Sequence, residues 1–270
     1  MPHTPYIILT PKGGPVADKI TTVKTGKDLD NIREACRLLA EAKKYIKGEI
    51  KAGISTYVID RLFQKKVKDM GAQCAFLGYD GFPGALCLSV NDQFLHCPPS
   101  EHTILRKGDL LKIDSGVRFK GMNSDSAFTV VVDEPKPAGD IKRLIDGTKE
   151  AMYAGIDAVK DGCRTGDITH AVETVLRKHK LGAVYQLGGH GIGESVHEGP
   201  FIHMSRAVKG TGPTLKAGMT ICIEPMATLG GDDVIFDDKD GWSIWTADGS
   251  LGAHFEETIL VTKDGAEILT

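Results

Sequence analysis

The stretch LRKGDLLKID at residues 105–114 is repeated in altered form as LKAGMTICIE at residues 215–224. Both stretches are typical of a turn, then a buried strand, then a carboxylate, which is Asp114 in the first copy and Glu224 in the second. A shorter pair lies upstream, since IKAG at 50–53 resembles VKDG at 159–162. The similar spacing of the two pairs indicates an internal duplication.

Two helical patterns stand before each copy of the repeat. Thr25 and Asp28 have the spacing of a capping box at the start of the first helix. Short apolar and alternating runs over 75–132, and again beyond residue 182, predict strands and hairpins. Apolar periodicity predicts helices over 29–46, 58–70, 141–160 and 168–180.

The order of two helices followed by strands therefore occurs twice. Two such units predict one α+β domain with pseudo-twofold symmetry, a sheet shared between the halves and helices on one side. We expect a single domain over 27–270, with halves at about 27–135 and 136–270, so that Asp114 and Glu224 face each other across the seam. Residues 1–26, rich in Pro, Gly and Thr, are expected to form a loosely attached arm.

The composition is that of an ordinary globular protein. Hydrophobic residues make up 41% and charged residues 26% of the 270 residues. The formal net charge of −3 gives no positive field that would favour nucleic acid or an anionic membrane as a partner. The six cysteines include no C-x-x-C pair, and no targeting or membrane-spanning segment is visible, so we expect a cytoplasmic protein.

Two acids of the first half lie eleven residues apart, on either side of a predicted turn at 119–121. If a hairpin closes there, Asp114 and Asp125 come roughly opposite each other on neighbouring strands, where Cβ atoms are ~5 Å apart. Two anions this close require a shared proton or a cation. Taken alone the pair is ambiguous, because acids beside a hairpin turn are usually solvated.

The second half adds two more acids at strand ends. Glu224 is the repeat equivalent of Asp114, and Glu256 directly precedes an apolar strand over 257–261. A buried, unpaired carboxylate is costly, although either residue could face outward. Four acids placed by a duplication are harder to explain separately than as one site.

Three histidines extend this set. His190 lies in the glycine-rich run 188–193, which is not a dinucleotide-binding fingerprint because the chain reaches Pro200 without opening a helix. His197 follows it, and His96 lies where a strand enters a proline-rich turn. Carboxylates with an imidazole suit Mn, Fe, Co or Zn rather than a soft copper site.

Taken together, these residues resemble type I methionine aminopeptidases, which are metallopeptidases of the pita-bread (creatinase/aminopeptidase) fold. The resemblance spans about 25–270. Five motifs carry it, namely KID at 112–114, NSDS at 123–126, GHGIG at 189–193, IEPM at 223–226 and FE at 255–256.

The resemblance implies a function and a set of roles. It implies removal of the N-terminal methionine from nascent chains with a small second residue, with nascent polypeptide N-termini and the ribosome as candidate partners, and a monomer. Glu224 would also shuttle protons, His96 would meet the scissile nitrogen, and His197 would steady the carbonyl oxygen. The implied ligands of two divalent ions (Co, Mn, Fe or Zn) are Asp114, Asp125, His190, Glu224 and Glu256. The implied methionine pocket, for which plain core packing stays an alternative, is Phe76, Tyr79, Phe82, Cys87 and Trp242.

Several positions depart from the family pattern. Glu257 stands where His is usual and His254 where Gln is usual, so either could alter metal choice or the pKa of the bridging water. Val196 replaces a larger residue and Phe76 a smaller one, which would reshape the pocket, and Ser124 takes a common Gly position.

Two other functions stay open. An Xaa-Pro aminopeptidase or dipeptidase of the same fold shares the five ligands but usually carries a large N-terminal domain. A metal-free pita-bread binding module would typically have lost ligands. The type II methionine enzymes are disfavoured, because the span between Glu224 and Glu256 leaves no room for their helical insertion.

Overall fold

The structure is a computed structural model that describes residues 21–270. The expected arm over 1–26 lies largely outside the described residues, and its boundary stays a prediction. Within 21–270, no helix has both the length and the apolar character that crossing a membrane would require.

The first half has two helices followed by strands. Ser55 caps the second helix, since its Oγ accepts the Val58 N–H at 3.3 Å. Thr25 precedes the first helix, but its side chain makes no capping bond, so the predicted capping box is wrong. The elements are α1 Gly26–Glu49, α2 Thr56–Asp69, β1 Gln73–Cys74, the 3-10 turn η1 Tyr79–Gly81, β2 Leu86–Val90, β3 Gln93–Leu95, β4 Leu110–Phe119 and β5 Met122–Val131.

The second half repeats this order. Its helices start and end within three residues of the predicted positions. The elements are α3 Gly139–Asp157, α4 Thr165–Lys178, β6 Gly182–Ala183, β7 Gly188–Gly191, β8 Glu198–His203, β9 Thr220–Ile223, β10 Met226–Thr228, β11 Val234–Phe236, β12 Ile244–Thr246, β13 Gly252–His254, β14 Glu257–Val261 and β15 Ala266–Ile268.

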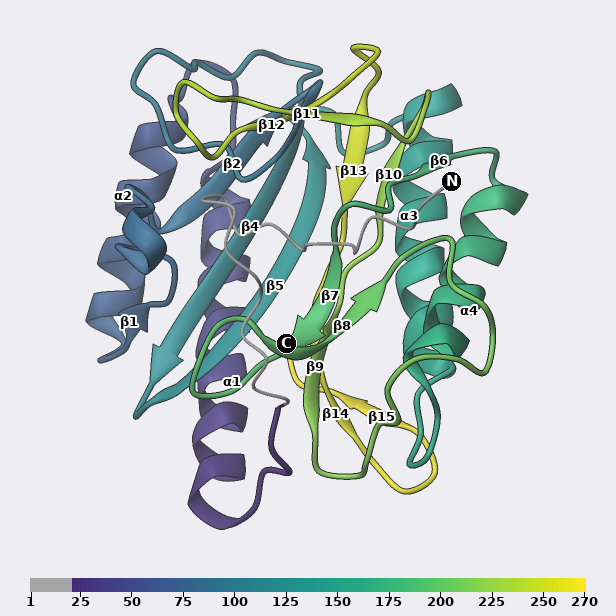
Figure 1. The fold of residues 1–270 in the computed structure, drawn as a ribbon. Helices are drawn as coiled ribbons and strands as arrows, with labels where there is room; N and C mark the ends of the chain where they lie inside the picture. The colour runs from purple at the N-terminus through teal and green to yellow at the C-terminus, as the bar shows by residue number, and fades with distance from the viewer. Residues whose placement is uncertain (1–20) are drawn as a thin grey trace.

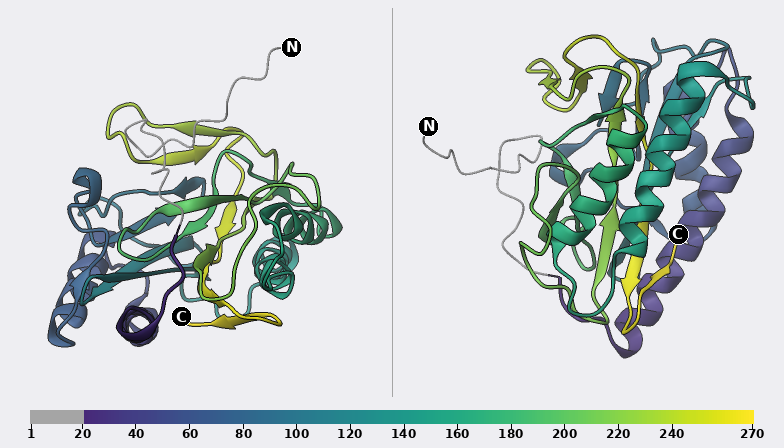
Figure 2. Two further views of the ribbon diagram at one scale, coloured as in Figure 1. Left: turned by 60° about the horizontal axis from the view of Figure 1, so that its bottom comes forward. Right: turned by 90° about the vertical axis from the view of Figure 1, so that its right-hand side faces the viewer.

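The strands lie between two helix pairs (Figure 1). In the first half, β4 pairs with β1 and β2 along one edge and with β5 along the other. In the second half, one sheet has the order β15-β14-β9-β7-β8. Helix α1 packs on β4 and β5, whereas α3 packs on β9, β10 and β13 and lies beside α4 (Figure 2). Each half therefore buries its helix pair against its own strands.

Each half has its own hydrophobic core. Leu39 of α1 and Phe63 of α2 pack with Ile113 of β4 in the first. Ile168 of α4 packs with Ile223 of β9 in the second. These side chains lie on the apolar faces that the helical and strand periodicities predict.

The duplication is visible bond by bond. Backbone hydrogen bonds that close the first half recur at the equivalent positions of the second half, with N···O distances of 2.8–2.9 Å. The matched bonds, donor first, are Gly53–Leu105 with Gly162–Leu215, Leu105–Ile54 with Leu215–Cys163, and Gly108–Val132 with Gly218–Val261. The predicted pair of helix-helix-sheet halves is confirmed.

The halves meet where β5 runs beside the chain from His254 to Thr258. Ala127 and Glu256 exchange both of their backbone hydrogen bonds, at 3.3 and 3.0 Å. On one side of this pair, Thr258 Oγ1 accepts the Asp125 N–H at 3.1 Å and donates to the Asp125 carbonyl at 2.7 Å. We call this contact between the halves the seam.

The contact on the other side of the seam is related to the first by a twofold rotation. Thr129 Oγ1 accepts the His254 N–H at 3.0 Å and donates to the His254 carbonyl at 2.8 Å. The strand registers pair Ile113 with Phe128 and its repeat equivalent Ile223 with Glu257. Counting along each strand from these pairs makes Ala127 equivalent to Glu256, Thr129 to Thr258, and Asp125 to His254. The pseudo-twofold axis therefore passes between Ala127 and Glu256.

Candidate metal centre

A single pocket of about 510 Å³, counting the part open to solvent, lies at the seam. Its walls contain every residue that the sequence nominates for the site. The lining is Phe76, Tyr79, Phe82, Cys87, His96, Asp114, Asp125, His190, His197, Glu224, Trp242 and Glu256. The structure thus brings the nominated residues together, and their individual roles stay predictions.

Asp114 and Asp125 lie on the same face of the β4–β5 hairpin. The sequence predicts that they are roughly opposite each other, but they are offset along the two strands. The register pairs Asp114 with Ala127 and Asp125 with Gly116, so the two acids are diagonal neighbours. The turn that sets this register consists of Lys120 and Gly121, both with positive φ. A directly opposite pairing of the two acids would require the centre of the turn to lie one residue earlier. Diagonal carboxylates are still within reach of one cation.

The four acids share one electrostatic environment. Burial raises the pKa of Asp114 to about 7, although a hydrogen bond with Asp125 opposes the shift. Burial also raises the pKa values of Asp125, Glu224 and Glu256 well above the ordinary value, and the neighbouring carboxylates raise them further. Without a cation, this cluster therefore holds protons at neutral pH.

His190 presents one ring nitrogen to the acids. Its Nδ1 lies 2.9 Å from the Gly191 carbonyl, so the proton resides on Nδ1 and the lone pair on Nε2. That Nε2 is 3.4 Å from Glu224 Oε1. Burial lowers the pKa of His190 to about 4, which keeps the imidazole neutral and able to ligate.

The glycines around His190 allow neighbouring strands to pack closely. Residues 188–191 form strand β7 and not a loop. A Cβ on Gly189 would lie 2.3 Å from the Cys222 carbonyl, and one on Gly191 would lie 2.3 Å from the Gly199 carbonyl. The absence of side chains therefore lets β7 approach β9 and β8 closely.

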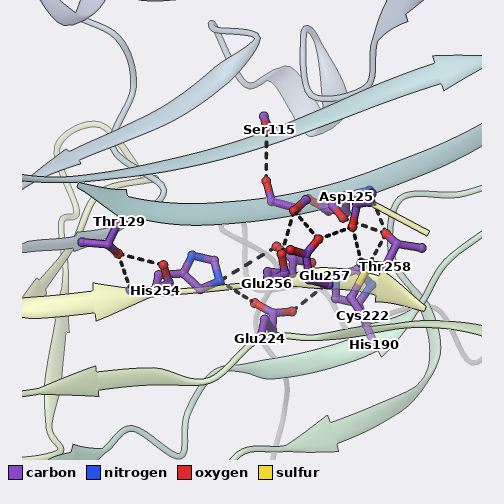
Figure 3. Close-up of polar contacts among 12 residues, drawn as sticks. Ser115, Asp125, Thr129, His190, Cys222, Glu224, His254, Glu256, Glu257 and Thr258 are labelled. Carbon is purple, nitrogen blue, oxygen red and sulfur yellow. Dashed lines mark hydrogen bonds and ion pairs between the residues drawn. The ribbon is translucent and has the colours of Figure 1, made fainter. Parts of the chain in front are cut away.

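The donor set fits divalent metal ions. Asp114 Oδ1, Asp125 Oδ1 and Glu256 Oε1 are buried and have no hydrogen-bond partner in the described part of the chain, which is costly unless a cation satisfies them. Cys222 lies among Asp125, His190 and Glu256 (Figure 3). Burial raises the pKa of its thiol well above the ordinary value, so the sulfur is protonated while no cation is bound. The remaining donors are oxygens and imidazole.

Glu257 and His254, the two residues near Glu256 that differ from the family pattern, point to opposite sides of the strand. The Glu257 carboxylate points to the other side of β14, where its Oε2 accepts from Ser126 Oγ at 3.2 Å and lies 3.4 Å from Lys43 Nζ. Its effect on the metal site is therefore indirect. His254 points to the acids, with Nε2 3.5 Å from Glu224 Oε2 and 3.9 Å from Glu256 Oε2 (Figure 3).

The apolar part of the pocket is a small cluster of its own. Phe76, Phe82, Cys87 and Val196 pack together, and Trp242 packs against them. The Phe82 and Trp242 rings meet edge to face with centroids 4.9 Å apart. Val196 packs in this cluster behind the lining residues, and the expectation that its small size reshapes the pocket stays a prediction.

His96 and His197 line the same pocket as the apolar cluster and the acids. His96 has a φ of 55°, a left-handed conformation that is uncommon for residues other than glycine. Burial lowers the pKa of His96 to about 4 and that of His197 well below its usual value. His197 Nδ1 lies 3.1 Å from the Tyr79 hydroxyl, and its ring meets the His190 ring with centroids 4.5 Å apart. Both imidazoles are therefore neutral.

The sequence analysis missed the residues that hold the acids in place. The Thr258 hydroxyl bonds both the N–H and the carbonyl group of Asp125, and the Thr129 hydroxyl does the same for His254. In the sequence these threonines are distinguished only by lying in strands that also carry site residues. Their role can be inferred only when the pairing of the strands across the seam is known.

Comparisons with known proteins agree with this geometry. The model of metallopeptidase family M24 matches residues 30–263. A methionine aminopeptidase of Aquifex aeolicus is 37% identical over 253 residues, which cover 90% of this chain and 96% of that protein. The crystal structure of a methionine aminopeptidase from Rickettsia prowazekii has a TM-score of 0.89 and 37% identity, covering 93% of this chain and all of that chain.

A more distant likeness concerns the fold alone. A prolidase from Pyrococcus furiosus has a TM-score of 0.72 at 24% identity. The match covers 92% of this chain but only 65% of the prolidase. The larger length of that protein agrees with the expectation that Xaa-Pro enzymes carry an additional domain.

Proposed function

Because this chain belongs to metallopeptidase family M24, we propose that its pocket hydrolyses the peptide bond after an N-terminal methionine. One observation carries the proposal: four buried acids and His190 converge beside an apolar pocket in a chain that matches methionine aminopeptidases over nine-tenths of its length. The relatives favour this function over an Xaa-Pro peptidase and over a metal-free binding module.

The metal ligands are the five residues that the resemblance names. Asp114, Asp125, His190, Glu224 and Glu256 hold two divalent ions, with Mn, Fe, Co and Zn as the candidates. When bound, such ions lower the pKa of water and polarise a carbonyl group. Four carboxylates and one neutral imidazole balance the charge of two divalent ions.

The remaining steps belong to protein side chains. Glu224 lines the pocket, and its carboxylate takes the proton from the attacking water and delivers it to the departing amine. The Tyr79 hydroxyl donates to His197 Nδ1, which leaves the His197 proton on Nε2 to bond the substrate carbonyl oxygen. His96 contacts the scissile nitrogen from the opposite wall.

The apolar cluster explains the side-chain preference. Phe76, Phe82 and Trp242 present aromatic faces, and Cys87 adds a sulfur, which together suit a thioether side chain. The free amine of the substrate lies toward Asp114, so only a chain terminus fits. The preference for a small second residue is what the family resemblance implies.

The test is release of methionine from a Met-Ala-Ser peptide by metal-free protein supplied with Mn, Fe, Co or Zn in turn. We expect turnover with at least one metal and none after chelation. A peptide beginning Ala-Pro tests the Xaa-Pro alternative, and preferential cleavage of it would overturn the proposal. Folded protein that releases no methionine with any metal would support the binding-module function.

The cellular setting is a proposal of the same kind. We expect nascent polypeptide N-termini to be the substrates, in the cytoplasm, with the ribosome as a candidate partner and the chain acting as a monomer. Competition by unlabelled nascent-chain peptides that begin with Met-Ala, but not with Met-Lys, would support this substrate class.

A further inference from the structure

His254 is a buried imidazole without a hydrogen bond on either ring nitrogen. Its side chain is 1% exposed, and among residues 21–270 neither Nδ1 nor Nε2 has a hydrogen-bond partner. Its backbone is held rigidly, because Thr129 Oγ1 bonds both its N–H and its carbonyl group. A side chain this confined, with both polar atoms unsatisfied, needs a partner that the protein atoms do not supply.

The ring points to two acids of the metal centre. Nε2 lies 3.5 Å from Glu224 Oε2 and 3.9 Å from Glu256 Oε2. These distances are long for hydrogen bonds. Donors bound to one tetrahedral ion at ~2.1 Å are about 3.4 Å apart, so the three atoms are spaced as ligands of a shared cation.

The symmetry of the fold points to the same conclusion independently. His254 is the repeat equivalent of Asp125, and both residues are held by a threonine across the seam in the same way. Asp125 faces the acids from one side of the Ala127–Glu256 pair, and His254 faces them from the other. The position that provides a ligand in the first half thus carries a second potential ligand in the other half.

We propose that His254 is a metal ligand, and that Glu224, His254 and Glu256 together bind one of the two divalent ions. The proposal rests on the dinuclear centre of the proposed function and adds a sixth protein ligand to it. His190, on the other side of Glu224, then serves the companion ion (Figure 3). With two imidazoles the centre favours borderline ions such as Zn or Co over Mn.

The test counts imidazole ligands directly. In cobalt(II)-loaded protein, each coordinated histidine gives a strongly shifted ring N–H resonance in the proton NMR spectrum. We expect two such resonances in the unaltered protein, one in His254→Gln and one in His190→Gln. The exposed His102 provides the control, since His102→Gln should leave both resonances in place.

The alternative outcome is equally definite. A single resonance that persists in His254→Gln and disappears in His190→Gln would overturn the proposal and leave His254 as a neighbour of Glu224 only. Metal analysis after dialysis against graded chelator is the second measurement. We expect His254→Gln to bind zinc at least tenfold more weakly, and unchanged zinc retention would also count against the ligand.

The outcomes separate this proposal from the proposed function. Two resonances in protein that releases no methionine would refute the activity and keep the ligand assignment. One resonance in protein that does release methionine would refute the ligand and keep the activity.

Discussion

At the scale of single residues, Asp125 occupies the most crowded position of the centre. The carboxylates of Glu256, Asp114 and Glu224 all raise its pKa, and its Oδ1 has no hydrogen-bond partner. Its backbone is fixed by Thr258 whatever its side chain is. The side chain can therefore be changed without loosening the strand.

We expect Asp125→Asn to fold normally and to lose metal. The amide has the same shape as the carboxylate but lacks the negative charge that would offset the positive charge of the bound cations. Metal content after dialysis should fall below the value of the unaltered protein, while the circular dichroism spectrum stays the same. The exposed Asp264→Asn is the matched control, and equal metal content in both variants would remove Asp125 from the ligands.

For His96 we expect the opposite result, in which a substitution leaves the metal content unchanged and lowers the catalytic rate. His96→Ala removes a positioned imidazole from the pocket wall but no ligand. We expect kcat to fall by roughly a hundredfold or more, as for other positioned acid-base groups, with metal content unchanged. His102→Ala, at an exposed position, should keep full activity. A fully active His96→Ala enzyme would refute the role.

The five candidate ligands among the lining residues could be nominated from the sequence because short motifs carry them, and the roles of the other seven followed only from the family resemblance. The orientation of Glu257 and His254 could not be predicted, because adjacent strand residues face opposite sides, and the seam decides which side meets the acids. The left-handed backbone of His96 is likewise invisible in the sequence, since a positive φ at a non-glycine residue depends on tertiary contacts.

At the scale of elements, strand β7 determines where His190 lies. Gly189 and Gly191 let the strand approach its neighbours to distances that no side chain allows. The position of the imidazole therefore depends on two residues that carry no functional group.

We expect Gly189→Ala to destabilise the protein by ~1–3 kcal/mol, because the new methyl group meets the Cys222 carbonyl. The strand must move, so metal retention should fall as well. Gly48→Ala is the control, because Gly48 is exposed in α1 with no atom near its potential Cβ. That variant should gain about 0.4–1 kcal/mol, measured by urea unfolding. Equal stability of the two variants would contradict the close-packing role.

The helices and the first strands of each half could be predicted because the repeat keeps a nearly constant spacing there. The equivalence of β5 and β14 could not, because the hairpin β11–β12 is inserted between β10 and β13 and shifts the spacing. Val58 shows another limit: it fits the apolar period of α2 but is 43% exposed, because no element packs on that side of the helix.

At the scale of the whole molecule, both halves contribute acids to the pocket, where protons and cations compete for the carboxylates. Asp114 has a pKa of about 7, and the other three acids have pKa values well above the ordinary value. A cation needs the charged carboxylates, so binding must release the protons they hold.

The sign of the pH effect follows directly. Raising the pH removes the competing protons, so metal affinity should increase between about pH 6 and pH 8. His190, with a pKa of about 4, is already neutral there and contributes nothing to the slope. Calorimetric titration with zinc in two buffers of different ionisation enthalpy should show release of more than one proton. A dissociation constant that does not vary with pH would contradict the protonated state of the cluster.

The seam also bears on how such a chain could arise. Ala127 and Glu256 bond each other and are equivalent by the repeat, and the Thr129–His254 and Thr258–Asp125 contacts are exchanged by the same axis. Such self-complementary contact is how two copies of one polypeptide meet in a symmetric dimer. Two copies of a half-length chain could meet through the same contact, with the pocket on the axis. In this chain the two equivalent positions differ, because one carries an aspartate and the other a histidine.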